Sequence, residues 1–83
     1  MTDTHFVLFT TDNCVNCPFV KAYVAANSEG LDVTIMDARA QPAVTGMFNV
    51  RQVPTLLKLG KENEELGRCV GNDLSKIEEL LRA

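Results

Sequence analysis

Two cysteines separated by two residues, Cys14 and Cys17, are the side chains of this sequence best suited to chemistry. Such a pair can form a redox-active dithiol, supply half of a metal site, or arise by chance. Structural zinc sites usually combine two closely spaced pairs, whereas Cys69 and His5 are each isolated in the sequence. We therefore expect a redox dithiol and no bound metal, with a non-catalytic metal-binding or partner-binding module as the alternative.

The chemistry of the pair depends on a thiolate at Cys14. The start of a helix has N–H groups without backbone partners and a partial positive charge, and both stabilise an anion. If the following helix opens on the cysteines, the pKa of Cys14 falls below the value of about 8.5 for a free cysteine. Cys14 then attacks a substrate disulfide, and Cys17 resolves the mixed disulfide. Lys21 is either a further positive charge near the thiolate or an ordinary exposed lysine.

The composition restricts where the chain works and what it binds. Its 83 residues, 46% hydrophobic and 23% charged, are expected to form one compact domain over residues 1–83. The sequence has no apolar run of membrane-spanning length and no secretory signal, so we expect a cytoplasmic, monomeric protein. A net charge of -3 without a basic stripe argues against a nucleic-acid partner. An odd number of cysteines in a reducing compartment argues against a permanent structural disulfide.

Apolar periodicity and turn residues predict the elements that position the cysteines. The predicted strands are His5–Thr10, Leu31–Asp37, Thr55–Leu59 and Glu65–Val70. The predicted helices are Phe19–Asn27, residues 38–48 with Pro42 in the first turn, and residues 72–83 behind Asn72 or Asp73 as cap. The order βαβαββα predicts an α/β fold with a four-stranded mixed sheet flanked by helices.

The large apolar side chains are expected to fill the core of so small a domain. The aromatic residues assigned to the core are Phe6, Phe9, Phe19, Tyr23 and Phe48. Cys69, on the last predicted strand, is expected to be a small buried packing residue.

The segments around the cysteines and around Pro54 resemble a known superfamily. The stretch FVLFTTDNCVNCPFVKAYV resembles the opening of glutaredoxins and of the small glutaredoxin-like redoxins that reduce ribonucleotide reductase. The stretch FNVRQVPTLLKLGKENEELGRCVGNDLSKIEELL resembles the second half of thioredoxins. On these motifs, which cover nearly the whole sequence, the chain is identified as a member of the thioredoxin superfamily.

This resemblance implies a thioredoxin-like fold and a protein-disulfide reductase that passes electrons to enzymes such as ribonucleotide reductase. It implies no cofactor beyond the dithiol, which thioredoxin reductase or glutathione would reduce again. It also implies that Val53-Pro54 is a cis peptide bond beside the sulfurs, that the Val53 backbone pairs with an extended substrate segment, and that Gly71 lies near the site. Four polar residues either bind a peptide or glutathione, or are only surface residues or helix caps: Arg51, Gln52, Asn72 and Asp73.

Several positions depart from the superfamily pattern. Leu8 stands where thioredoxins carry a buried aspartate, and Asn13 stands where they carry tryptophan. Thr11 stands near the lysine with which glutaredoxins bind the glutathione carboxylate, and Gln52 replaces their threonine. These differences favour thioredoxin reductase over glutathione as the electron donor, although the sequence leaves both open.

Overall fold

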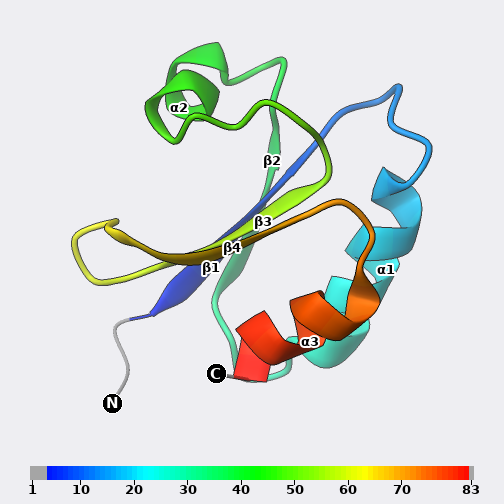
Figure 1. Ribbon diagram of the computed structural model, residues 1–83, viewed down its shortest axis with the longest axis vertical. Helices are drawn as coiled ribbons and strands as arrows, with labels where there is room; N and C mark the ends of the chain where they lie inside the picture. Colours follow the sequence, from blue (N-terminus) through cyan, green and yellow to red (C-terminus); the bar gives the residue numbers. More distant parts are fainter. Residues whose placement is uncertain (1–3, 83) are drawn as a thin grey trace.

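The computed structural model describes residues 4–82. Its elements follow the predicted order: β1 (His5–Thr10), α1 (Cys17–Asn27), β2 (Val33–Asp37), α2 (Pro42–Met47), β3 (Thr55–Leu59), β4 (Glu65–Val70) and α3 (Leu74–Arg82). The predicted α/β fold, with a four-stranded mixed sheet and three helices, is confirmed (Figure 1). Residues 1–3 and 83, which the predicted domain includes, lie outside the described residues.

The strand order in the sheet is β2-β1-β3-β4. β1 pairs with β2 in parallel, and β3 runs antiparallel to both β1 and β4. The carboxyl ends of β1, β2 and β4 and the amino end of β3 therefore lie at the same end of the sheet. This end carries the loop from β1 to α1, the segment before β3 and the turn from β4 to α3.

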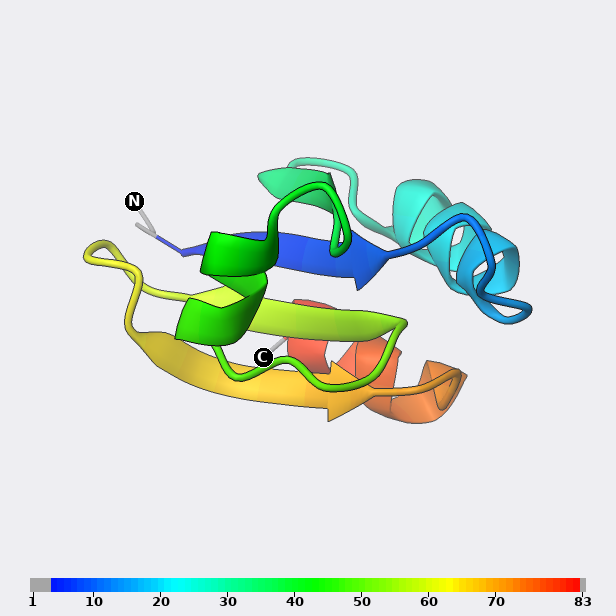
Figure 2. The same cartoon turned by 90° about the horizontal axis from the view of Figure 1, so that it is seen from above.

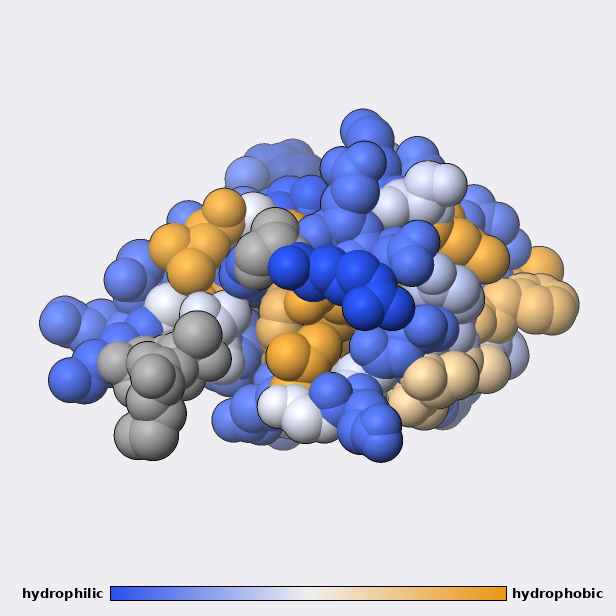
Figure 3. Space-filling model, turned by 90° about the horizontal axis from the view of Figure 1, so that it is seen from below, coloured by the Kyte–Doolittle hydropathy of each residue, from blue (hydrophilic) through white to orange (hydrophobic). Residues whose placement is uncertain are grey.

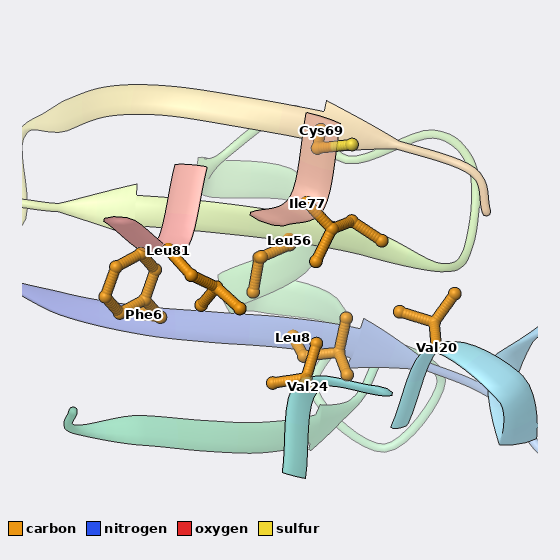
Figure 4. Close-up of a cluster of buried hydrophobic side chains, with 8 residues drawn as sticks. All are labelled: Phe6, Leu8, Val20, Val24, Leu56, Cys69, Ile77 and Leu81. Carbon is orange, nitrogen blue, oxygen red and sulfur yellow. The ribbon is translucent and has the colours of Figure 1, made fainter. Parts of the chain in front are cut away.

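Helices cover both faces of the sheet, with α1 and α3 on one face and α2 on the other (Figures 1 and 2). Successive side chains of a strand point to opposite faces, so β1 supplies both cores. Phe6 and Leu8 pack with Val20 and Val24 of α1 and with Ile77 of α3 (Figure 4). Val7 and Phe9 belong to the second core, against which the partly buried Val44 and Phe48 pack.

Phe19 is not a core residue, contrary to the prediction from its size. The buried residues of α1 are Cys17, Val20 and Val24, spaced by three and four residues along one helical stripe. Phe19 lies off this stripe and is 67% exposed. The other aromatic residues assigned to the core are buried or pack against it.

Several element boundaries also differ from the predicted ones. α2 spans Pro42–Met47 rather than residues 38–48, because Pro42 stands in its first turn. α1 begins at Cys17 rather than Phe19, because Pro18 is tolerated in the first turn, where its missing N–H has no helical partner. β2 begins at Val33 rather than Leu31. As an edge strand, β2 leaves Ile35 47% exposed, although this residue pairs with the fully buried Leu8.

Candidate active site

Cys14 and Cys17 form a disulfide. Their Cα atoms are 5.3 Å apart, within the ordinary range for such a bond. The two residues differ in exposure: Cys14 is partly exposed, whereas Cys17 is only 2% exposed. A partner sulfur can therefore approach Cys14 from solvent, while Cys17 lies beneath it on the first turn of α1.

The loop between β1 and α1 places Cys14 just outside the helix. The N–H of Cys14 donates to the carbonyl of Thr11 at 3.4 Å, which folds the loop back toward the end of β1. Asn16 is the N-cap of α1 and makes no side-chain capping hydrogen bond, and the first turn contains no acidic residue. The positive end of the helix dipole is therefore not offset by a side-chain anion, and a thiolate beside it is favoured.

The segment before β3 lies next to this loop. Phe9 pairs with Thr55 across β1 and β3, so Pro54 lies beside the end of β1, where the loop to the cysteines starts. The Val53-Pro54 peptide bond is cis, and Pro54 is buried. The hydroxyl of Thr55 donates to the carbonyl of Gln52 at 2.6 Å and so closes the turn that carries these residues.

The turn after β4 is joined to the same segment. The N–H of Gly71 donates to the carbonyl of Pro54 at 2.8 Å, and Gly71 has a φ of 89°, a conformation that favours glycine. Asn72 follows and is exposed. Asp73, not Asn72, caps α3, because its side-chain oxygen accepts from the N–H of Lys76 at 3.2 Å.

The structure thus brings together, at one end of the sheet, the residues singled out in the sequence. The segment before β3 contains Gln52, Val53 and Pro54, and the turn after β4 contains Gly71 and Asn72. The cysteines follow β1 at the same end.

The surroundings below the cysteines are apolar. Leu8, which the sequence resemblance aligns with an aspartate of thioredoxins, is fully buried among Val20, Val24 and Leu56. Cys69 lies in the same cluster (Figure 4). Burial, followed by the nearby Asp73 carboxylate, raises the pKa of the Cys69 thiol.

The comparison with known sequences gives a thioredoxin-like relative. No family model matches the chain. It is 30% identical over 70 residues to the SPbeta prophage-derived thioredoxin-like protein YosR of Bacillus subtilis, covering 84% of this chain and 85% of that protein. The chain belongs to the thioredoxin-like proteins.

Solved structures agree with this assignment at the level of the fold. A mutant thioredoxin from Halobacterium salinarum is 25% identical, with a TM-score of 0.84 over 98% of this chain and 74% of that chain. Reduced Schistosoma mansoni thioredoxin is 19% identical, with a TM-score of 0.89 over 98% of this chain and 78% of that chain. Taken with the Cys14–Cys17 disulfide, the membership makes this thioredoxin-like chain a thiol-disulfide oxidoreductase.

A rim of apolar side chains close to the cysteines was missed by sequence reasoning. Val15, between the cysteines, is 81% exposed, and Val70, next to Gly71, is 45% exposed. Val15 and Phe19, each within two residues of a cysteine, place hydrophobic surface beside the disulfide, and Val70 adds exposed apolar surface at the end of β4. Figure 3 shows such surface at the right-hand end of its view, the end at which Figure 1 shows the start of α1. Helical periodicity alone would have identified Phe19, because this residue lies outside the buried stripe.

The described part of this thioredoxin-like chain offers neither a cluster of metal ligands nor a membrane-spanning helix. Among residues 4–82, no group of three or more His, Cys, Asp and Glu side chains is placed to hold a metal ion. No helix in this range is long and apolar enough to cross a membrane.

Proposed function

We propose that this thioredoxin-like chain reduces disulfide bonds of protein substrates by dithiol exchange. The observation that carries the proposal is the contrast within one disulfide, in which Cys14 is partly exposed and Cys17 is 2% exposed. A partly exposed cysteine next to a helix start without a side-chain cap is suited to attack. A buried sulfur bonded to it is suited to release the product.

The reaction proceeds in two exchanges. The Cys14 thiolate attacks one sulfur of the substrate disulfide, forming a mixed disulfide and releasing the other substrate sulfur as a thiolate. Cys17 loses its proton and attacks the Cys14 sulfur, which releases the second substrate thiolate and forms the Cys14–Cys17 disulfide. Two electrons pass from the dithiol to the substrate. Because Leu8 replaces the buried acid, the departing substrate thiolate or solvent accepts the Cys17 proton.

Substrate binding is assigned to the segments beside the cysteines. Pro54 has no N–H of its own, and the Val53 backbone is proposed to pair with an extended segment of the substrate. Gln52 flanks this segment, and Gly71 and Asn72 border it from the turn after β4. The exposed apolar rim supplies contact area without demanding a particular sequence.

We also propose a compartment, an oligomeric state and an electron donor for this reaction. The chain works as a cytoplasmic monomer consisting of one domain, without a bound cofactor. Thioredoxin reductase restores its dithiol, and glutathione is the alternative donor. Thr11, in place of a glutathione-binding lysine, supports the first donor. Enzymes such as ribonucleotide reductase are candidate substrates.

Cysteine variants test the proposed reaction. Cys14→Ser is expected to reduce insulin disulfides no faster than buffer, because the attacking sulfur is gone. Cys17→Ser is expected to accumulate mixed disulfides with substrate, detectable by mass spectrometry under oxidising conditions. Cys69→Ala is the matched control that removes a thiol outside the exchange, and it should keep full activity.

Two results would refute this assignment. Full insulin reduction by Cys14→Ser would exclude Cys14 as nucleophile, and the absence of any trapped species with Cys17→Ser would exclude Cys17 as resolving thiol. If the protein purified under reducing conditions instead carried stoichiometric zinc, the metal-binding module would replace the enzyme.

A coupled assay identifies the electron donor. NADPH with thioredoxin reductase is expected to support insulin reduction by the wild-type chain, whereas NADPH with glutathione and glutathione reductase is expected to give slow turnover. Faster turnover in the second mixture would reverse the assignment of the donor while leaving the dithiol mechanism in place.

A further inference from the structure

A small pocket lies beside the segment that carries Pro54. It has a volume of about 200 Å³. Figure 2 shows the segment between α2 and β3 running along β4, and the pocket lies between them. Its lining residues are Asn49, Arg51, Gln52, Thr55, Arg68 and Val70.

The positive charge available in this pocket is that of Arg51. Its Nε donates to the side-chain oxygen of Asn49 at 3.1 Å, which orients the guanidinium. Within residues 4–82 this is the only hydrogen bond that the Arg51 side chain makes, so both Nη groups are available to a ligand. The edge formed by the two free Nη groups matches the geometry of a carboxylate.

The second guanidinium of the pocket is already occupied. Arg68 forms an ion pair with Glu65 at 2.8 Å and donates to the carbonyl of Phe48 at 2.6 Å. No acidic residue is among those lining the pocket. Although the whole chain has a net charge of -3, this position beside the site is therefore positive.

Resting on the proposed function, we infer that Arg51 is a specificity-determining residue that binds an aspartate or glutamate of the protein substrate. A substrate segment paired with Val53 is extended and advances about 3.3 Å per residue. Arg51 precedes Val53 by two residues in the sequence. The acidic residue therefore lies within about two positions of the substrate cysteine, with Val70 against its methylene groups.

The inference is tested with short peptides linked into disulfide dimers through a single cysteine. Three peptides carry glutamate, glutamine or lysine two positions on either side of this cysteine, and glutathione disulfide is a fourth substrate. The rate at which reduced protein releases each thiol is measured after acid quenching. Wild type is expected to reduce the glutamate peptide roughly fivefold faster than the glutamine peptide, the upper range for an exposed ion pair.

Variants assign this preference to one side chain. Arg51→Gln is expected to reduce the glutamate and glutamine peptides at equal rates, and Arg51→Glu is expected to favour the lysine peptide. Lys61→Glu is the matched control. It makes the same change of charge in the turn between β3 and β4, at the opposite end of the strands from Pro54, and it should retain the wild-type preference.

The outcomes separate this inference from the proposed function. A wild-type protein that reduces the glutamine peptide but shows no preference for glutamate would overturn the inference alone. So would an unchanged preference in Arg51→Gln, an equal loss of preference in Lys61→Glu, or Arg51-dependent reduction of glutathione disulfide faster than that of the glutamate peptide. Failure to reduce any of the peptides would overturn the proposed function instead.

Discussion

Cys69 and Cys14 carry the same thiol group in different surroundings. Cys69 is 4% exposed, packs among Leu56 and Ile77, and directs its sulfur to the carbonyl of Asp73 at 3.8 Å. Burial and the Asp73 carboxylate raise the pKa of Cys69, with a smaller opposing effect from Lys76. Cys14 is partly exposed beside a helix start. The thiolate is the reactive form of cysteine, so only one of these two residues is suited to exchange.

Alkylation measures this difference. In a Cys14→Ser/Cys17→Ser variant, Cys69 should not react with iodoacetamide at neutral pH, and it should react fully in concentrated guanidinium chloride. Mass spectrometry counts the added groups. Rapid labelling of the folded variant would show that Cys69 is accessible and would place a third reactive thiol in the protein.

The raised pKa of Cys69 also gives a pH dependence with a definite sign. The folded state holds the proton to a higher pH than the unfolded state, so stability from this group is complete below the unfolded pKa, about 8.5. It is lost as the pH rises through that value toward the folded pKa. The free energy of unfolding of the wild type should therefore fall more steeply above about pH 8.5 than that of Cys69→Ala. Parallel profiles would contradict the effect of burial.

At the scale of elements, hydrogen bonds from the Arg68 side chain join β4 to the segment before Pro54. Its guanidinium donates to the carbonyls of Phe48 and Asn49 at 2.6 and 3.4 Å and pairs with Glu65. The hydrogen bond from Arg68 lowers the pKa of Glu65. The stability from this pairing is therefore present above the ordinary carboxyl pKa and is lost as the pH falls through the lowered value.

Removing the hydrogen bonds of Arg68 should make the segment before Pro54 less stable. Arg68→Met keeps much of the side-chain stem and loses the hydrogen bonds, and we expect it to lower the free energy of unfolding by about 1–2 kcal/mol. It should also speed hydrogen exchange of the Val50 N–H, which donates to the Thr45 carbonyl at 3.0 Å. Arg82→Met, which removes an exposed pair with Glu78, should cost less than about 0.5 kcal/mol and leave this exchange unchanged. Equal Val50 exchange in both variants would show that Arg68 does not hold the segment.

The elements show which features the sequence could predict. Alternation and apolar runs predicted each strand and helix, because these patterns reflect which faces are buried. The exposure of Ile35 depends on β2 being an edge strand, which requires the strand order and not the local pattern. The exposure of Phe19 was predictable from the stripe formed by Val20 and Val24, but its large apolar side chain was given more weight than its position.

Only the local part of the site was predicted from the sequence. The spacing of Cys14 and Cys17 is local, so the sequence states it directly. The hydrogen bond between Gly71 and Pro54 and the contact between Arg68 and Phe48 join residues far apart in the chain. Only the pairing of β3 with β1 and β4 brings these residues together, and no local pattern encodes that geometry.

At the scale of the molecule, the Cα radius of gyration is 11.7 Å, close to the value of about 12 Å expected for a compact chain of this length. Both faces of the sheet are buried, and Cys17 belongs to α1, which contributes Val20 and Val24 to one of the two cores. The redox state of the pair is therefore coupled to the stability of a cooperatively folded chain, which is expected to unfold in a single transition.

The oxidised protein should be more stable than the reduced protein. The Cys14–Cys17 disulfide closes a loop of only a few residues, for which the chain-entropy relation gives a stabilisation of about 2 kcal/mol. In a chain of this length that corresponds to a rise in Tm of roughly 10 °C. Thermal unfolding followed by circular dichroism, with and without dithiothreitol, measures the difference. The Cys14→Ser/Cys17→Ser variant should not respond to dithiothreitol, and a wild-type Tm equally insensitive to the reductant would show that closing the disulfide does not stabilise the fold.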